Sequence, residues 1–143
     1  MNTLPVRLTR PAADLPTRAH PTDAGLDLCA AETVHIPPRV VTLVPTGIAV
    51  AIPAGYVGLL VARSSLAVKK AMTLANGVGV IDADYRGEIK VPIISLDGCH
   101  NLIQAGTRIA QLLILPIALP TVEVVAELPD SDRGAGAFGS TGA

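Results

Sequence analysis

Residues 33–61 read TVHIPPRVVTLVPTGIAVAIPAGYVGLLV, and this stretch decides the fold class. It holds short runs of β-branched and aliphatic residues, and proline or glycine separates each run from the next. Short strands with turn residues about every 8 to 12 positions are typical of a β-sandwich or barrel rather than of a helical or βαβ fold. The sequence therefore predicts an all-β domain.

Further apolar runs flank this stretch and extend the prediction. Additional strands are expected at residues 6–8, 24–28, 89–95, 109–115 and 122–125, with those at 89–95 and 109–115 fully buried. Asp27 lies within AGLDL, where it could simply face solvent from a half-buried strand. Gln111 is the polar residue of IAQLLIL. Because an unpaired buried amide costs about 1–3 kcal/mol, Gln111 must find internal partners or face a ligand.

One segment, SSLAVKKA at residues 64–71, reads as a helix. Ser64 can cap its N-terminus, while Lys69 and Lys70 suit its C-terminal end. A helix start offers free N–H groups and a partial positive charge, and Arg63 just before it adds a full charge. These residues predict a phosphate-binding site. The alternative is an ordinary capped helix with a solvated Arg63.

The composition bounds the functional class. A chain of 143 residues suits a single domain. Its net charge of −1 gives no broad basic face, which argues against nucleic acid as a partner. Charged residues interrupt any apolar run near the N-terminus, so we expect no export signal and a cytoplasmic location.

The apolar content predicts self-association. Hydrophobic residues make up 50% of the chain, although aromatic residues make up only 2%. Polar residues and prolines interrupt the runs, so no window reaches the roughly 20 apolar residues that a membrane helix requires. A soluble monomer of this composition would expose apolar surface that favours aggregation, and burial of that surface between identical subunits avoids the exposure. We therefore expect a homo-oligomer and no membrane partner.

The segment TLANGVGVIDADYRGEIKVPII, residues 73–94, is the richest in reactive groups. Two apolar runs flank it, so a hairpin-like loop would expose several carboxylates together with Tyr85. A solvated turn explains the Asp and Gly residues equally well. Aromatic residues are rare in this chain, however, and a ring placed in glycine-rich polar surroundings suggests contact with a ligand.

The C-terminal residues 129–143 read PDSDRGAGAFGSTGA and hold too little apolar surface to order themselves. A disordered terminus is the simplest interpretation. Arg133, Phe138, Ser140 and Thr141 stand among glycines, however, and such groups can wrap a triphosphate and stack on a flat base.

Five short motifs, taken together, resemble those of the trimeric deoxyuridine triphosphate nucleotidohydrolases, the dUTPases. They span nearly the whole chain and follow the order of that family. The motifs are AGLDL at 24–28, ARSSLA at 62–67, GVIDADYRGEI at 79–89 with LAN before it at 74–76, GTRIAQL at 106–112 and RGAGAFGSTG at 133–142.

The resemblance implies an all-β, jelly-roll-like fold with one short helix, assembled as a homotrimer with active sites at subunit interfaces. Residues 1–128 would form the catalytic domain, and residues 129–143 a flexible, glycine-rich lid over the site. The implied reaction is hydrolysis of dUTP to dUMP and pyrophosphate, which keeps uracil out of DNA and supplies dUMP for thymidylate synthesis.

The resemblance also assigns the catalytic and metal residues. Asp82 would orient and activate the attacking water. Asp27 would hold a water of a Mg²⁺ ion that is bound mainly by the triphosphate, in keeping with the reluctance of Mg²⁺ to shed its water shell.

The remaining family roles concern the substrate. Contacts to the phosphate chain are implied for Arg63, Ser64, Ser65 and Gln111, contacts to uracil for Asn76 and the backbone near Gly79, and a contact to the deoxyribose for Tyr85. In the lid, Arg133 would reach the γ-phosphate, Phe138 would cover the uracil, and Ser140 and Thr141 would hold phosphates.

Four residues depart from the usual family pattern: Ala62, Ser65, Thr107 and Ala137. Thr107 replaces a common acidic residue, which puts any interaction of that carboxylate in doubt. Two alternatives stay open. The dCTP deaminases share the fold and an RSSLA-like element but are usually longer and lack this combination of motifs. The second alternative is a family member without catalytic activity that senses nucleotides.

Overall fold

The computed structural model describes residues 3–132 and 134–135. These residues form mainly strands, with one short helix: β1 (Val6–Leu8), β2 (Leu26–Cys29), β3 (Val34–Ile36), β4 (Thr42–Pro45), β5 (Ile48–Val50), β6 (Tyr56–Ala62), α1 (Ser64–Lys70), β7 (Met72–Leu74), β8 (Val78–Ile81), β9 (Lys90–Ser95), β10 (Asn101–Ile103) and β11 (Arg108–Pro116). The predicted all-β class with one helix is confirmed.

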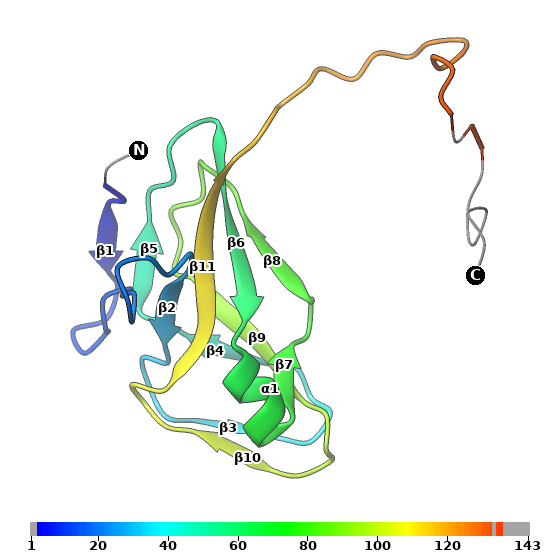
Figure 1. Ribbon diagram of the computed structural model, residues 1–143. Coiled ribbons are helices and arrows are strands. Elements are labelled where there is room, and N and C mark those ends of the chain that lie inside the picture. The colour runs from blue at the N-terminus through cyan, green and yellow to red at the C-terminus, as the bar shows by residue number, and fades with distance from the viewer. Residues whose placement is uncertain (1–2, 133, 136–143) are drawn as a thin grey trace.

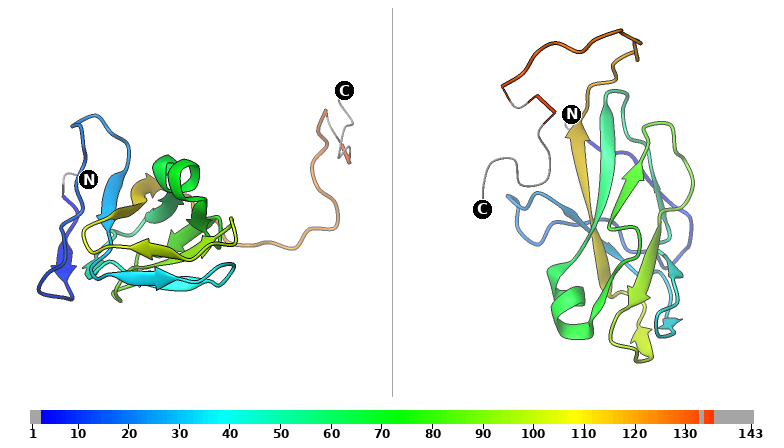
Figure 2. Two further views of the ribbon diagram at one scale, coloured as in Figure 1. Left: turned by 90° about the horizontal axis from the view of Figure 1, so that it is seen from below. Right: turned by 90° about the vertical axis from the view of Figure 1, so that its right-hand side faces the viewer.

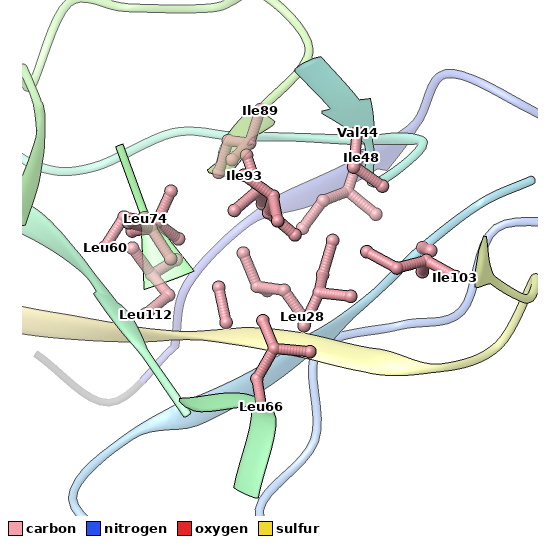
Figure 3. Packing of buried hydrophobic residues seen from close by; sticks show 14 of the residues in the cluster. Leu28, Val44, Ile48, Leu60, Leu66, Leu74, Ile89, Ile93, Ile103 and Leu112 are labelled. Atoms are coloured by element: carbon pink, nitrogen blue, oxygen red, sulfur yellow. The ribbon is translucent and has the colours of Figure 1, made fainter. Parts of the chain in front are cut away.

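Two antiparallel sheets form the body of the protein (Figure 1). The larger has the strand order β2-β11-β6-β8, and the smaller has the order β4-β9-β7. Two-stranded pairs, β1 with β5 and β3 with β10, complete the described sheets. Apolar side chains of both main sheets meet in one buried cluster, which includes Leu28, Leu60 and Leu112 from the larger sheet and Val44 and Ile93 from the smaller (Figure 3).

Strand β11 is one of the two inner strands of the larger sheet and aligns several candidate residues. It pairs with β2 on one side and with β6 on the other. This register places Gln111 opposite Asp27 on β2. The expectation that 89–95 and 109–115 are fully buried is wrong, because buried and more exposed residues alternate along most of β9 and β11. Each of these strands therefore has one face toward the core.

Helix α1 follows β6 directly and sits at one end of the larger sheet (Figure 1). The prediction that Ser64 caps the helix is wrong, because Ser64 is already the first helical residue. The N-cap residue is Arg63, which has an extended backbone and makes no capping hydrogen bond with its side chain. Lys69 and Lys70 do lie in the last turn. The buried side chain of Leu66 anchors the helix to the core (Figure 3).

The segment after β8 is not the expected hairpin. β8 pairs with β6 in the larger sheet, whereas β9 pairs with β4 and β7 in the smaller one. Each strand thus satisfies its backbone groups with a different partner, so residues 82–89 cross from one sheet to the other. We call residues 82–89 the crossover.

The chain leaves the body after β11. The Ile117 N–H donates to the Gly55 carbonyl at 2.9 Å, and residues 118–132 then extend away from the sheets (Figures 1 and 2). The strand expected at 122–125 is wrong for the single chain. Val122 is 90% and Val124 is 96% exposed, because this segment lies beyond the sheets of the body. We call residues 117–132 the arm segment.

Candidate functional site

Asp27 lies at the centre of a charged cluster. It is only 3% exposed although it is ionisable. Its Oδ1 accepts a hydrogen bond from Gln111 Nε2 and pairs with Arg63 Nε, both at 3.1 Å, while Arg108 Nη1 reaches its Oδ2 at 3.1 Å. Two guanidinium groups thus offset the cost of burying one carboxylate.

The fold brings these four residues together from different parts of the sequence. The register of β2 and β11 sets Asp27 beside Gln111, while Arg63 follows the end of β6 and Arg108 begins β11. Gln111 is half-buried and has an internal partner, as one of the two predicted alternatives required. Sequence reasoning missed Arg108, because only the pairing of β11 with β2 reveals that this arginine faces Asp27.

A cationic cavity of about 300 Å³ lies next to this cluster, between α1 and the start of β11. Its lining consists of Arg63, Ser65, Leu66, Lys69, Lys70, Thr107 and Arg108. Four of these side chains carry positive charge, and Thr107 adds none. Ser64 stands beside the cavity as the first residue of α1. The cavity can hold an anion, and phosphate is well matched to arginine.

A second cavity, of about 280 Å³, lies between β8, the crossover and β9. Four predicted site residues, Asn76, Gly79, Asp82 and Tyr85, line it. The other lining residues are Leu43, Leu60, Val80, Ile81, Glu88, Ile89, Lys90 and Pro92. A mostly apolar lining with a few polar groups is typical of a small-molecule pocket. We call it the β8 pocket.

Gly79 shapes the wall of this pocket. A β-carbon on Gly79 would lie 3.1 Å from Leu60 Cβ on the neighbouring strand and 3.5 Å from Asn76 Nδ2. A side chain at this position would therefore press on Leu60 and touch Asn76. The lack of a side chain leaves backbone groups accessible at the pocket wall.

Hydrogen bonds fix the shape of the crossover. Tyr85 N–H donates to the Asp82 carbonyl at 3.2 Å, and the Tyr85 hydroxyl donates to the Glu88 carbonyl at 2.9 Å. Arg86 Nη1 donates to the carbonyls of Ala83, at 2.6 Å, and Tyr85, at 2.9 Å. The pocket side of the crossover is thus formed within one chain.

The Glu88 carboxylate ties the crossover to the body. It accepts a hydrogen bond from Gly47 N–H at 2.9 Å and from Arg10 Nε at 3.1 Å. Arg10 also pairs with Glu32 at 2.6 Å. Burial opposes the charged form of Arg10, but attraction to Glu88 and Glu32 outweighs that effect and raises its pKa.

The two neighbouring carboxylates of the crossover occupy different positions. Asp82 lines the β8 pocket, and it also lines an adjacent cavity of about 290 Å³ that contains Asp84 and Ile117. Asp84 is absent from the lining of the β8 pocket. Position in the sequence could not choose between these two residues, whereas the structure sets Asp82 beside Asn76 and Tyr85.

The predicted site residues fall into two groups in the single chain. Asp27, Arg63, Ser65 and Gln111 belong to the cluster and the cationic cavity, while the other group lines the β8 pocket. No described cavity contains members of both. The predicted lid residues Arg133, Phe138, Ser140 and Thr141 lie outside the described residues.

A metal ion would find little protein coordination here. Across residues 3–132 and 134–135, no group of three or more His, Cys, Asp or Glu side chains could hold a metal. Asp27 offers one carboxylate beside the cationic cavity, and both of its oxygens already have protein partners. Mg²⁺ prefers oxygen ligands and retains several waters, so this single carboxylate fits an ion held mainly by phosphates and water.

A β-sandwich with a cationic cavity and a mostly apolar pocket suits the class of proteins that bind anionic small molecules. The family model of the dUTPases matches residues 12–142, and the chain belongs to this family. The resemblance seen in the motifs is confirmed. In the described part of the chain, no helix is long and apolar enough to span a membrane.

Similar proteins cover almost the entire chain. The deoxyuridine 5'-triphosphate nucleotidohydrolase of Corynebacterium jeikeium is 50% identical over 147 residues, covering 99% of this chain and 95% of that protein. The protein of the same name from Rhodococcus erythropolis is 49% identical over 142 residues, covering 97% and 87%, respectively.

Solved structures show the same fold. The dUTPase of Staphylococcus bacteriophage 80alpha with dUpNHpp has a TM-score of 0.91, 35% identity and 100% coverage of both chains. A point mutant of the phage phi11 dUTPase, described for its coordination of a structural Mg(II) ion, has a TM-score of 0.80 and 35% identity, covering 88% of this chain and 98% of that one.

Proposed function

We infer that this chain is a dUTP diphosphatase, which hydrolyses dUTP to dUMP and pyrophosphate and so limits the uracil available for incorporation into DNA. The observation that carries the inference is the convergence of Asn76, Gly79, Asp82 and Tyr85 on one small pocket. Names of relatives at about half identity over nearly the full chain support the same substrate.

The β8 pocket is the proposed binding site of the deoxyuridine. The Asn76 amide and the backbone near Gly79 hydrogen-bond the uracil edge, and the close contact of β8 with Leu60 leaves no room for the methyl group of thymine. Tyr85 packs on the deoxyribose and excludes a 2'-hydroxyl. Hydrogen-bond complementarity can reject a wrong base by about 10⁴–10⁵-fold, whereas a methyl group alone typically gives roughly 10- to 200-fold.

Asp82 is the proposed catalytic carboxylate. It accepts a hydrogen bond from water and orients it toward the α-phosphorus, where attack breaks the bond to the departing pyrophosphate. Such a displacement needs an in-line nucleophile and neutralisation of phosphate charge, and little else from the protein. The location of Asp82 in the β8 pocket, on an exposed position of the crossover, supports this role.

The phosphate chain is assigned to Arg63, Ser64, Ser65 and Gln111. Three of these residues lie in or beside the cationic cavity, and the fourth, Gln111, shares Asp27 with Arg63. In the proposed complex, Arg63 and Gln111 turn part of their hydrogen-bonding capacity from Asp27 to phosphate oxygens. Positive charge held in place beside the phosphates counters the charge of the transferring group.

Mg²⁺ is the proposed cofactor, and Asp27 is the residue that would contact it through water. When bound, the ion would neutralise phosphate charge and help to hold the triphosphate in one conformation. The Mg(II) ion of the phage phi11 protein supports use of this metal in the family.

A homotrimer is the proposed assembly, because one chain separates the β8 pocket from the cationic cavity. A neighbouring subunit can bring its β8 pocket to the cationic cavity and complete one site. The exposed apolar side chains of the arm segment, such as Val122 and Val124, also suit burial against another copy.

Residues 129–143 are the proposed lid, which begins near the end of the arm segment. Residues 1–128 form the catalytic domain, and in residues 129–143 Arg133 binds the γ-phosphate, Phe138 covers uracil, and Ser140 and Thr141 hold phosphates. The cytoplasm is the proposed location, since the nucleotide pool for DNA synthesis lies there.

A substrate panel tests the function. Pyrophosphate release is measured with dUTP, dTTP, dCTP and UTP, with and without Mg²⁺, and turnover should be confined to dUTP. Comparable turnover of dTTP or UTP would overturn the roles of the β8 pocket and Tyr85, and ammonia release from dCTP would identify a deaminase instead. Sedimentation tests the assembly: a fully active monomer of 14.6 kDa contradicts the trimer.

A further inference from the structure

Gly87 lies in the middle of the crossover and does not have the left-handed backbone that most often requires glycine. Gly47, Gly55, Gly77 and Gly98 have positive φ angles, which disfavour other residues, but Gly87 does not. A left-handed backbone therefore does not explain the glycine at this position. Some other feature of the structure must account for the missing side chain.

The ring of Tyr85 supplies that reason. A β-carbon on Gly87 would lie 2.7 Å from Tyr85 Cζ and 3.0 Å from Cε2, and it would also overlap the hydroxyl oxygen. Carbon atoms in proteins approach favourably only to about 3.5–4.0 Å. The Tyr85 ring thus lies directly against the Gly87 backbone, in space that any larger residue would occupy.

Tyr85 is held by its backbone and by the hydroxyl at the tip of its ring. Its backbone N–H donates to the Asp82 carbonyl at 3.2 Å, and its hydroxyl donates to the Glu88 carbonyl at 2.9 Å. Glu88 is in turn held by Gly47 N–H and Arg10. A ring that is 45% exposed would otherwise sample several rotamers, and the bond from its hydroxyl to the Glu88 carbonyl favours one of them.

We propose that Gly87 is a positioning residue for sugar selection: by leaving its side-chain space to the Tyr85 ring, it holds that ring at the one place where a deoxyribose fits and a ribose does not. The proposal rests on the proposed function, in which Tyr85 packs on the deoxyribose. Gly87 acts through the ring alone and does not line the β8 pocket.

The test compares the selectivity for dUTP over UTP, as the ratio of the two kcat/KM values, in four proteins: wild type, Gly87→Ala, Tyr85→Ala and the double variant. Gly87→Ala should lower the ratio about tenfold, because displacing a substrate-contacting group by about 1 Å can cost as much as 10²-fold. In the Tyr85→Ala background the same change should leave the ratio unaltered, since the ring is no longer there to be displaced.

Two results would overturn the proposal: an unchanged ratio in Gly87→Ala, or an equal loss in both backgrounds. If Gly87→Ala fails to fold, Tyr85→Phe provides the test, because it removes only the bond to the Glu88 carbonyl. The selectivity for dUTP over UTP should be about threefold lower in Tyr85→Phe than in the wild type. An unchanged selectivity would refute the anchoring of the ring. A wild-type protein that does not prefer dUTP would instead refute the proposed function, so the two failures are distinguishable.

Discussion

The crossover and the arm segment are both irregular and both acidic, yet they are held in opposite ways. In the crossover, backbone and side-chain groups of Tyr85, Arg86 and Glu88 bond to one another and to the body. The arm segment is tied at its start, where Ile117 bonds to Gly55, and then leaves the sheets. Irregular backbone takes a fixed shape within one chain only where its polar groups find partners there.

The largest effect is expected at Asp82, in the well-held region. Asp82→Asn is nearly isosteric but cannot take a proton, so turnover should fall by roughly 10² or more, the range typical of a lost general base. Binding of a non-hydrolysable dUTP analogue, measured by calorimetry, should change little.

Asp84→Asn is the matched control, since Asp84 lies in the same crossover but outside the β8 pocket. It should have a much milder effect. Equal defects in the two variants would remove support for Asp82, and wild-type turnover of Asp82→Asn would disprove the mechanism.

The next effect tests the residues that follow the arm segment. Deleting every residue after Asp132 removes most of the proposed lid and none of the strands in the described residues, so the melting temperature and oligomeric state should stay unchanged. Turnover should fall by about a hundredfold, a cost typical of misplaced reacting groups. If steady-state assays show near-full activity, the terminus has no catalytic role.

A smaller effect, on stability, compares one glutamate from each region. Glu88→Ala removes the acceptor of Gly47 N–H and the partner of Arg10, and the Glu88 side chain is only 16% exposed. The free energy of unfolding should fall by about 1–3 kcal/mol. Glu123→Ala, on the exposed arm segment, should change it by less than about 0.5 kcal/mol in the same urea titration. Equal losses would contradict the difference between the two regions.

The smallest effect concerns a third irregular element, the turn after β9. Cys99 N–H and the Ser95 hydroxyl donate to Asp97 Oδ1, at 3.0 and 2.8 Å, and these bonds lower the Asp97 pKa from its ordinary value of 3.8. The carboxylate therefore stabilises the fold above that pH, and the contribution disappears as pH falls through the lowered pKa.

Asp97→Asn should remove this dependence. Thermal unfolding of the variant and the wild type should differ most near neutral pH and converge in acid. A difference that grows below pH 3.8 would show that the carboxylate does not stabilise the turn.

The features that could be predicted from the sequence are those that a local pattern of residues determines. The runs in 33–61 became strands β3 to β6, and the helix lies within one residue of its expected range. The crowding of Asn76, Asp82 and Tyr85 into one short segment was enough to suggest a pocket. These features depend on periodicity and on turn residues close together in the chain.

What could not be predicted depends on pairing between distant strands. The contact of Arg108 with Asp27 follows from the register of β2 and β11, and the separation of β8 from β9 follows from their different partners. The β-branched residues at 122–125 favour a strand, but a strand also needs a neighbour, and the single chain places none beside them in its described part.

The crossover joins the last strand of one sheet to the middle strand of the other, and this has a consequence for refolding. Hydrogen bonds hold the last residue of the crossover, Ile89, to residues 46–48. The Ile89 carbonyl accepts bonds from Thr46 N–H at 3.2 Å and from Thr46 Oγ1 at 2.6 Å, and the Ile89 N–H donates to the Ile48 carbonyl. The β8 pocket cannot acquire its shape while the sheets are apart. Recovery of nucleotide binding after dilution from denaturant therefore depends on contacts between distant parts of the chain, and contacts of this kind are intrinsically slow to form.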